Sequence, residues 1–349
     1  MTRSVLLVLV LLLSLPLAGR SEPVSFPEPN WTREAAIAAL SRSDTRPALA
    51  ELFRLARQGD NKALVAAIAR IRANPEVNDP ARDRLMHTFA AGLGDLPPGS
   101  VSQAVWDRLL SYRPATWVPD EHHPAVGVPL YNVRAAASGS LNEWRRLSAW
   151  SKGERLLNGT DGAWITAWEN ADPARRRGLV DGLQGATPDR LSQLGRAALE
   201  EANDSPGLSA VAARAALLAR DPDLFRRAVS HGGPGLSAAL RDAAGIFDAA
   251  ATADILRHVM TTAAPETGAL AMAQLAPPLL GEPEVATLMM ESLAHRDLGS
   301  SAALVLAGSE DPVIHAELAR LAKDGKALEK QRAALSVQLA EQRSREDLR

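Results

Sequence analysis

A repeat of about 30 residues is the feature that most limits how this 349-residue chain can fold. Four apolar anchors recur with separations of 31, 30 and 29 residues. An apolar residue also follows each anchor four positions later, a spacing typical of one buried helical face. The anchors are Leu224, Ile255, Val285 and Ile314.

Two further columns keep the same register. Because one pair of short helices cannot bury both of its apolar faces, these columns predict that neighbouring pairs stack and share a core. The residues four positions after the anchors are Ala228, Val259, Met289 and Leu318, and those twelve positions before them are Ala212, Ala243, Ala273 and Ala302.

Proline marks where the second helix of a pair begins. Pro222, Pro283 and Pro312 each follow an acidic residue two positions before an anchor. An acidic side chain can cap a helix, and proline suits the first helical position because no N–H is needed there. Gly232 and Gly233 predict the end of the helix that Asp221 begins.

The segments "ARDPDLFRRAV", "GEPEVATLMMESL" and "SEDPVIHAELARL" are similar to HEAT-like α-helical repeats, over residues 205–325. This resemblance implies an all-α fold, a right-handed α-solenoid of stacked short helix pairs, and it carries no catalytic residue. It also implies a protein that holds partners. Earlier second helices are expected after Asp172-Pro173 and Thr187-Pro188, so the predicted repeat region extends over 134–325.

The rest of the chain divides into segments of different character. The amino-terminal part shows helical periodicity at 31–40, 46–57, 61–73, 80–91 and 101–112. The polar end of the chain suits a helix that caps the last repeat. The predicted segments are a helical region at 31–115, a central irregular polar and aromatic loop at 116–133, and a capping helix at 326–349.

The first 19 residues have the pattern of a signal peptide: Arg3, an apolar run, then Ala18 and Gly19. The apolar run is shorter than the roughly 20 residues that a membrane-spanning helix needs. We therefore expect cleavage, a linker at 20–30, a periplasmic or secreted product, and no transmembrane anchor after cleavage.

Composition excludes several kinds of site. The chain has no cysteine, which excludes disulfides, thiolate metal sites and a cysteine nucleophile. Its formal net charge of −2 offers no overall attraction for nucleic acid. The sequence has no GxSxG, Walker or HExxH motif. We predict no cofactor, no resident metal and no nucleic-acid partner.

The loop at 116–133 carries the densest group of chemically active side chains, with Asp120, Glu121, His122 and His123 in a row. Pro119 and Pro124 flank this tetrad and disfavour helix at the residue before each, so an extended chain is predicted. Extended geometry would pair Asp120 with His122 and Glu121 with His123. A solvated loop, a partner contact and a metal or acid–base site all remain open.

Aromatic residues concentrate around this loop. Six of seven tryptophans and both tyrosines fall between residues 106 and 168. Tryptophan is favoured in interfaces and in surfaces that stack on ring-shaped ligands, but it also fills cores. The candidate binding residues are Trp117, Asp120, Glu121, His122, His123, Tyr131 and Trp144.

The leading functional hypothesis is a non-enzymatic helical scaffold or adaptor that binds another envelope protein. One alternative is a module that binds peptidoglycan or another glycan through the tryptophan-rich region. A second alternative is a hydrolase that uses the tetrad from Asp120 to His123.

Overall fold

The computed structural model describes residues 27–346 and is all-α. Its described part contains eighteen α-helices, three short 3₁₀ turns and one two-stranded sheet. The predicted signal peptide at 1–19 and most of the linker predicted at 20–30 lie outside the described residues. Contacts divide the chain into two compact units, with the boundary between Trp144 and Arg145.

Unit 1 is a helical bundle followed by a short hairpin. The five helices predicted between residues 31 and 115 all form, each with ends within two residues of the expected bounds. Their core includes the fully buried Leu52, Ile68 and Phe89. The helices are α2 (Arg33–Leu40), α3 (Arg46–Gln58), α4 (Asn61–Ala73), α5 (Asp79–Gly92) and α6 (Gln103–Leu110).

The central loop is more regular than the sequence suggested. Strands β1 (Trp117–Pro119) and β2 (Gly127–Pro129) pair antiparallel, with Val118 opposite Val128. The prediction of a loop without strands was therefore wrong here. Each strand has three residues and ends in a proline, so neither shows the alternating run by which strands are recognised.

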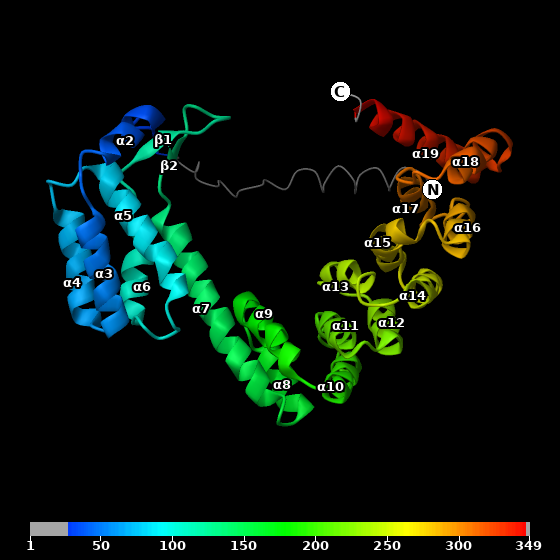
Figure 1. The fold of residues 1–349 in the computed structure, drawn as a ribbon, viewed down its shortest axis with the longest axis horizontal. Helices are drawn as coiled ribbons and strands as arrows, with labels where there is room; N and C mark the ends of the chain where they lie inside the picture. Colours follow the sequence, from blue (N-terminus) through cyan, green and yellow to red (C-terminus); the bar gives the residue numbers. More distant parts are fainter. Residues whose placement is uncertain (1–26, 347–349) are drawn as a thin grey trace, which may run out of the picture. The chain divides into compact units, whose positions relative to one another are not determined.

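Unit 2 is built from helices in two rows (Figure 1). In one row α8, α10, α12, α14 and α16 contact one another in succession, and in the other α11, α13, α15, α17 and α19 do so. Their bounds are α8 (Asp161–Glu169), α10 (Pro188–Glu200), α11 (Leu208–Ala219), α12 (Pro222–His231), α13 (Leu236–Ala243), α14 (Ala249–Thr262), α15 (Pro265–Leu275), α16 (Pro283–Ser292), α17 (Gly299–Leu306) and α19 (Ala327–Glu346).

Three further helices lie outside these two rows. Helix α7 (Val133–Leu156) contains the boundary between the units, and α9 (Pro173–Asp181) contacts α8. Helix α18 (Pro312–Asp324) packs on α19. Within residues 27–346, no helix is both long enough and apolar enough to cross a membrane.

The predicted repeat columns lie in one shared core. All four anchors and the four residues that follow them are at most 4% exposed. The third column holds at Ala212, Ala243 and Ala302 but is wrong at Ala273, which is exposed. A 3₁₀ turn at Pro277–Leu279 lengthens the connection between α15 and α16. Met272 and Leu275 fill the core in its place.

The predicted helix starts are confirmed. The carboxylate of Asp221 accepts a hydrogen bond of 3.0 Å from the Leu224 amide at the start of α12, with Pro222 as the first helical residue. Asp172 caps α9 in the same way, and Asp311 caps α18 by accepting a hydrogen bond from the Val313 amide. Glu282 precedes α16 without making a side-chain cap.

The carboxyl-terminal helix α19 packs through small side chains and an arginine. Leu328 and Leu335 are exposed, whereas Ala333 and Ser336 are buried. The Arg332 guanidinium donates to the backbone oxygens of Leu293, His295 and Arg296 and so fastens α19 to the connection before α17. Polar contacts therefore help to hold this helix at the end of the stack.

Candidate functional site

The acidic and histidine tetrad forms a turn. Oδ1 of Asp120 accepts hydrogen bonds from the amides of His122, at 2.9 Å, and His123, at 3.0 Å. These bonds lower the pKa of Asp120 because they stabilise its charged form. The prediction of an extended tetrad was wrong, because the flanking prolines restrict only the residues before them and leave residues 121–122 able to bend.

The two carboxylates of the tetrad are bound to groups other than imidazoles. Asp120 caps the backbone of the turn, and Glu121 lies 3.9 Å from Arg33 across an exposed ion pair. His122 and His123 are both exposed. In the part of the chain that the structure describes, no group of three or more His, Cys, Asp or Glu side chains is placed to hold a metal ion.

The amino-terminal end of the described chain holds this hairpin. The amides of Asn30 and Trp31 both donate to the Trp117 carbonyl oxygen, and the Gly127 amide donates to the Pro27 oxygen at 2.7 Å. A Cβ on Gly127 would lie 2.6 Å from that oxygen. The described part of the predicted linker, residues 27–30, is therefore built into unit 1.

A buried carboxylate that sequence analysis overlooked anchors the chain before the hairpin. Asp83 on α5 has no exposed surface and accepts hydrogen bonds from Tyr112 Oη at 2.7 Å and from the amides of Ala115, at 2.9 Å, and Thr116, at 2.8 Å. Burial raises its pKa, and these bonds oppose that rise. The carboxylate thus satisfies donors of an otherwise unpaired segment.

The remaining candidate aromatics serve the fold of unit 1. Trp144 is 5% exposed, donates from its indole nitrogen to the Leu93 oxygen at 2.8 Å, and packs edge-on against Trp106. Trp117 is half-buried and donates to the Pro114 oxygen, and Tyr131 contacts the His87 ring. The structure therefore brings the tetrad together but places Trp144 in the core.

Most tryptophans between residues 106 and 168 lie in the core. Trp106, Trp144, Trp164 and Trp168 are at most 7% exposed. Trp150 is 36% exposed, and its indole donates to Glu154. Four of the six rings are thus largely buried.

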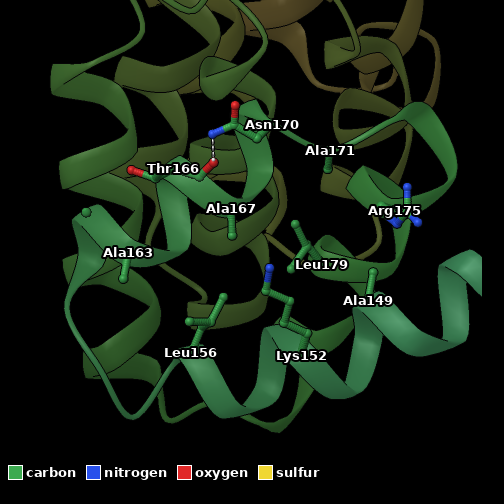
Figure 2. Close-up of a pocket in the computed structure, with 11 residues that line it drawn as sticks. Ala149, Lys152, Leu156, Ala163, Thr166, Ala167, Asn170, Ala171, Arg175 and Leu179 are labelled. Atoms are coloured by element: carbon green, nitrogen blue, oxygen red, sulfur yellow. Dashed lines mark hydrogen bonds between the residues drawn. The ribbon is translucent and has the colours of Figure 1, made fainter.

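In unit 2, a groove lies on each side of α9. The first, which we call the alanine groove, has a volume of about 650 Å³ and is shown in Figure 2. Its walls are mainly small and apolar, and the Lys152 side chain extends into it between Leu156 and Leu179. Arg175 lies at one end and is paired with Asp172 at 2.7 Å.

Glycines allow α9 to lie unusually close to α7. A Cβ on Gly178 would overlap the Arg146 carbonyl oxygen, and a Cβ on Gly182 would lie 2.8 Å from the Trp150 oxygen. Gly153 on α7 faces the Leu179 oxygen in the same way, at 2.9 Å. The position of α9, and with it the side chains on both of its faces, depends on this close contact.

The second groove, which we call the arginine groove, has a volume of about 570 Å³. Residues of α7, α8, α9, α11 and α13 line it, and they include four guanidinium groups and two carboxylates, a formal charge of +2. Trp168, Val180 and Val211 supply apolar surface. The charged residues are Arg146, Arg176, Arg177, Arg214, Asp181 and Asp242.

Neighbouring groups orient three of these four arginines. Arg146 pairs with Asp181 at 2.5 Å and Arg214 pairs with Asp242 at 2.9 Å. Arg176 lies 4.4 Å from the centre of the Trp168 ring and donates to the backbone oxygens of Trp168 and Glu169. Within residues 27–346, the exposed Arg177 guanidinium has no hydrogen-bonded or ionic partner.

The sequence pattern did not predict this groove. The run Arg175-Arg176-Arg177 is visible in the sequence, but consecutive residues point around a helix, and only the last two reach the arginine groove. No protein-family model, curated protein or solved structure matches the chain. The function is therefore inferred from the geometry of the chain itself.

Proposed function

We propose that this protein is an exported, non-enzymatic helical-repeat scaffold or adaptor that binds another envelope protein through unit 2. We also propose that its repeats form a HEAT-like, right-handed α-solenoid. The observation that carries the functional proposal is the arginine groove, because it spans side chains from α7 to α13 and gives the stacked helices a charged, concave surface. Stacked repeats commonly use such extended surfaces for binding.

The chemistry of the tetrad supports this choice over a hydrolase. A general base needs a carboxylate or imidazole within reach of a substrate proton and a partner that orients it. Here the Asp120 carboxylate accepts hydrogen bonds from backbone amides, and His122 and His123 lie on an exposed turn. The glycan alternative depends on exposed indole faces, and four of its six tryptophans are buried.

The proposal is tested by isolating the full chain from the envelope of its native host after mild chemical crosslinking. We expect one protein to co-purify in near-stoichiometric amount, and we expect a chain with the altered groove residues Arg177→Ala and Arg214→Ala to lose it. Repeated isolation without any stoichiometric partner would contradict the proposal.

A further inference from the structure

We propose that the arginine groove binds an extended, acidic segment of a protein partner. This inference rests on the proposed function and specifies which chemical class the groove recognises. The groove presents more guanidinium groups than carboxylates, although the whole chain has a formal net charge of −2. Its positive charge is therefore a local property of this surface.

The arginines are held ready for a ligand. Asp181 and Asp242 fix the positions of Arg146 and Arg214, and stacking on Trp168 fixes Arg176. An arginine that is already oriented loses less side-chain entropy when it binds a carboxylate. Arg177 on α9 also lines this groove, has no partner among residues 27–346, and provides the first contact for an incoming anion.

The distribution of charge favours a peptide over a compact anion. A phosphate group or lipid headgroup requires donors that converge without nearby carboxylates, whereas Asp181 and Asp242 lie within the groove and repel concentrated negative charge. A peptide spreads its carboxylates along the chain and brings backbone N–H groups for the two aspartates. The apolar surface of Val180 and Val211 suits its aliphatic side-chain stems.

The dimensions agree with this choice. The axes of packed helices lie about 8–10 Å apart, so a surface that crosses three neighbouring helices is about 16–20 Å long. An extended chain covers about 3.3 Å per residue and would cross that distance with about five or six residues. A segment with acidic residues at alternate positions would direct its carboxylates toward one side of the groove.

The test uses the full mature chain and a fluorescein-labelled eight-residue peptide with alternating glutamate and serine. Binding is followed by fluorescence anisotropy at about 50 mM and about 200 mM salt, since ion pairs at this surface are screened at the higher concentration. A peptide with glutamine in place of glutamate is the ligand control. We expect glutamate-dependent binding, with a Kd below about 1 mM, that weakens as salt rises.

Variants locate the binding site. We expect Arg177→Ala to weaken binding about threefold or more, and the double variant Arg177→Ala with Arg214→Ala to weaken it about tenfold or more. Arg175→Ala is the matched control, because it removes the same charge from the same helix but lines the alanine groove. It should change the affinity by less than about twofold. Arg177 is exposed, so its substitution leaves the fold intact.

Several results would overturn the inference. These are no binding of the glutamate peptide up to about 1 mM, equal binding of the glutamine peptide, or equal loss in Arg175→Ala and Arg177→Ala. Arginine-dependent binding of inorganic phosphate, or of vesicles containing phosphatidylglycerol, in place of the peptide would also overturn it. A native partner captured from a chain that fails these peptide tests would leave the proposed function standing, whereas peptide binding without any native partner would contradict only that function.

Discussion

The hairpin of unit 1 and the arginine groove of unit 2 differ in how their polar groups are used. In the hairpin, Asp120 closes a turn and the Trp117 indole binds a backbone oxygen. In the groove, side chains from five helices meet, and Arg177 remains without a partner in the described chain. Side chains that stand out in the sequence can thus be used in hydrogen bonds that stabilise the fold. A binding surface can instead form from residues that are far apart in the sequence and do not stand out there.

We expect the largest effect from Gly178→Ala, which tests whether the groove depends on the close packing of α7 and α9. Gly178→Ala places a methyl group against the Arg146 carbonyl oxygen, so α9 must shift. Overpacking against backbone should lower the free energy of unfolding of unit 2 by about 3 kcal/mol and weaken peptide binding. Chemical denaturation with hydrogen-exchange mass spectrometry would measure the loss within each unit.

Gly139→Ala is the matched control for this change. Gly139 lies on α7, the helix against which α9 packs, and a Cβ there would meet no atom within 4 Å. Alanine in a helix interior should stabilise the protein by up to about 1 kcal/mol. If both substitutions have equal effects, the glycine contact does not position α9.

The next effect concerns the segment that leads into the hairpin. Asp83→Ala leaves the Tyr112 hydroxyl and two amides without their buried acceptor, which should cost unit 1 about 2 kcal/mol. Asp83→Asn should cost less than about 1 kcal/mol, because its amide oxygen can accept from the two backbone amides while its nitrogen donates to Tyr112. Equal losses in the two variants, measured by urea denaturation, would show that the polar network is unimportant.

The same carboxylate predicts a pH dependence. Burial raises the pKa of Asp83, so the folded state binds its proton more tightly than the unfolded state does. Its contribution to stability is fully present below the ordinary carboxyl pKa of about 4 and is lost as the pH rises through the raised value. The unfolding free energy of the native chain relative to Asp83→Asn should therefore fall with rising pH. A difference that increases with pH would contradict this assignment.

The smallest expected effect is confined to the turn. Asp120→Ala removes the acceptor of two amide hydrogen bonds, so the amides of His122 and His123 should exchange faster with solvent while the helices remain unchanged. Because these bonds lower the Asp120 pKa, their contribution is present above the ordinary carboxyl pKa and is lost as the pH falls through the depressed value. Unchanged exchange of both amides, followed by NMR, would contradict the turn described here.

Local signals were enough to predict much of the fold. Helix periodicity and caps such as Asp221-Pro222 depend on neighbouring residues, and the anchor column from Leu224 to Ile314 follows from a fixed repeat. The spacing of that column does not predict the length of the connections between helices. The periodicity therefore did not indicate the turn at Pro277–Leu279, and Ala273 lies outside the core.

The site was less predictable because its contacts are distant in sequence. Asp83 acts on residues about 30 positions away, and Arg146 and Asp242 meet in one groove although nearly 100 residues separate them. Such groupings arise only after the helices have stacked. The tetrad lies on an exposed segment between two short strands, and its turn depends on backbone hydrogen bonds that composition does not reveal.

Placing a photo-crosslinking residue at position 238, an exposed alanine that lines the arginine groove, in one variant and at position 122 in another tests most directly whether the groove, and not the hairpin, is the binding surface. After irradiation in the native envelope, we expect one crosslinked partner from position 238, suppressed by an excess of the glutamate peptide, and none from position 122. A partner crosslinked from position 122 and absent from position 238 would contradict the proposed binding surface.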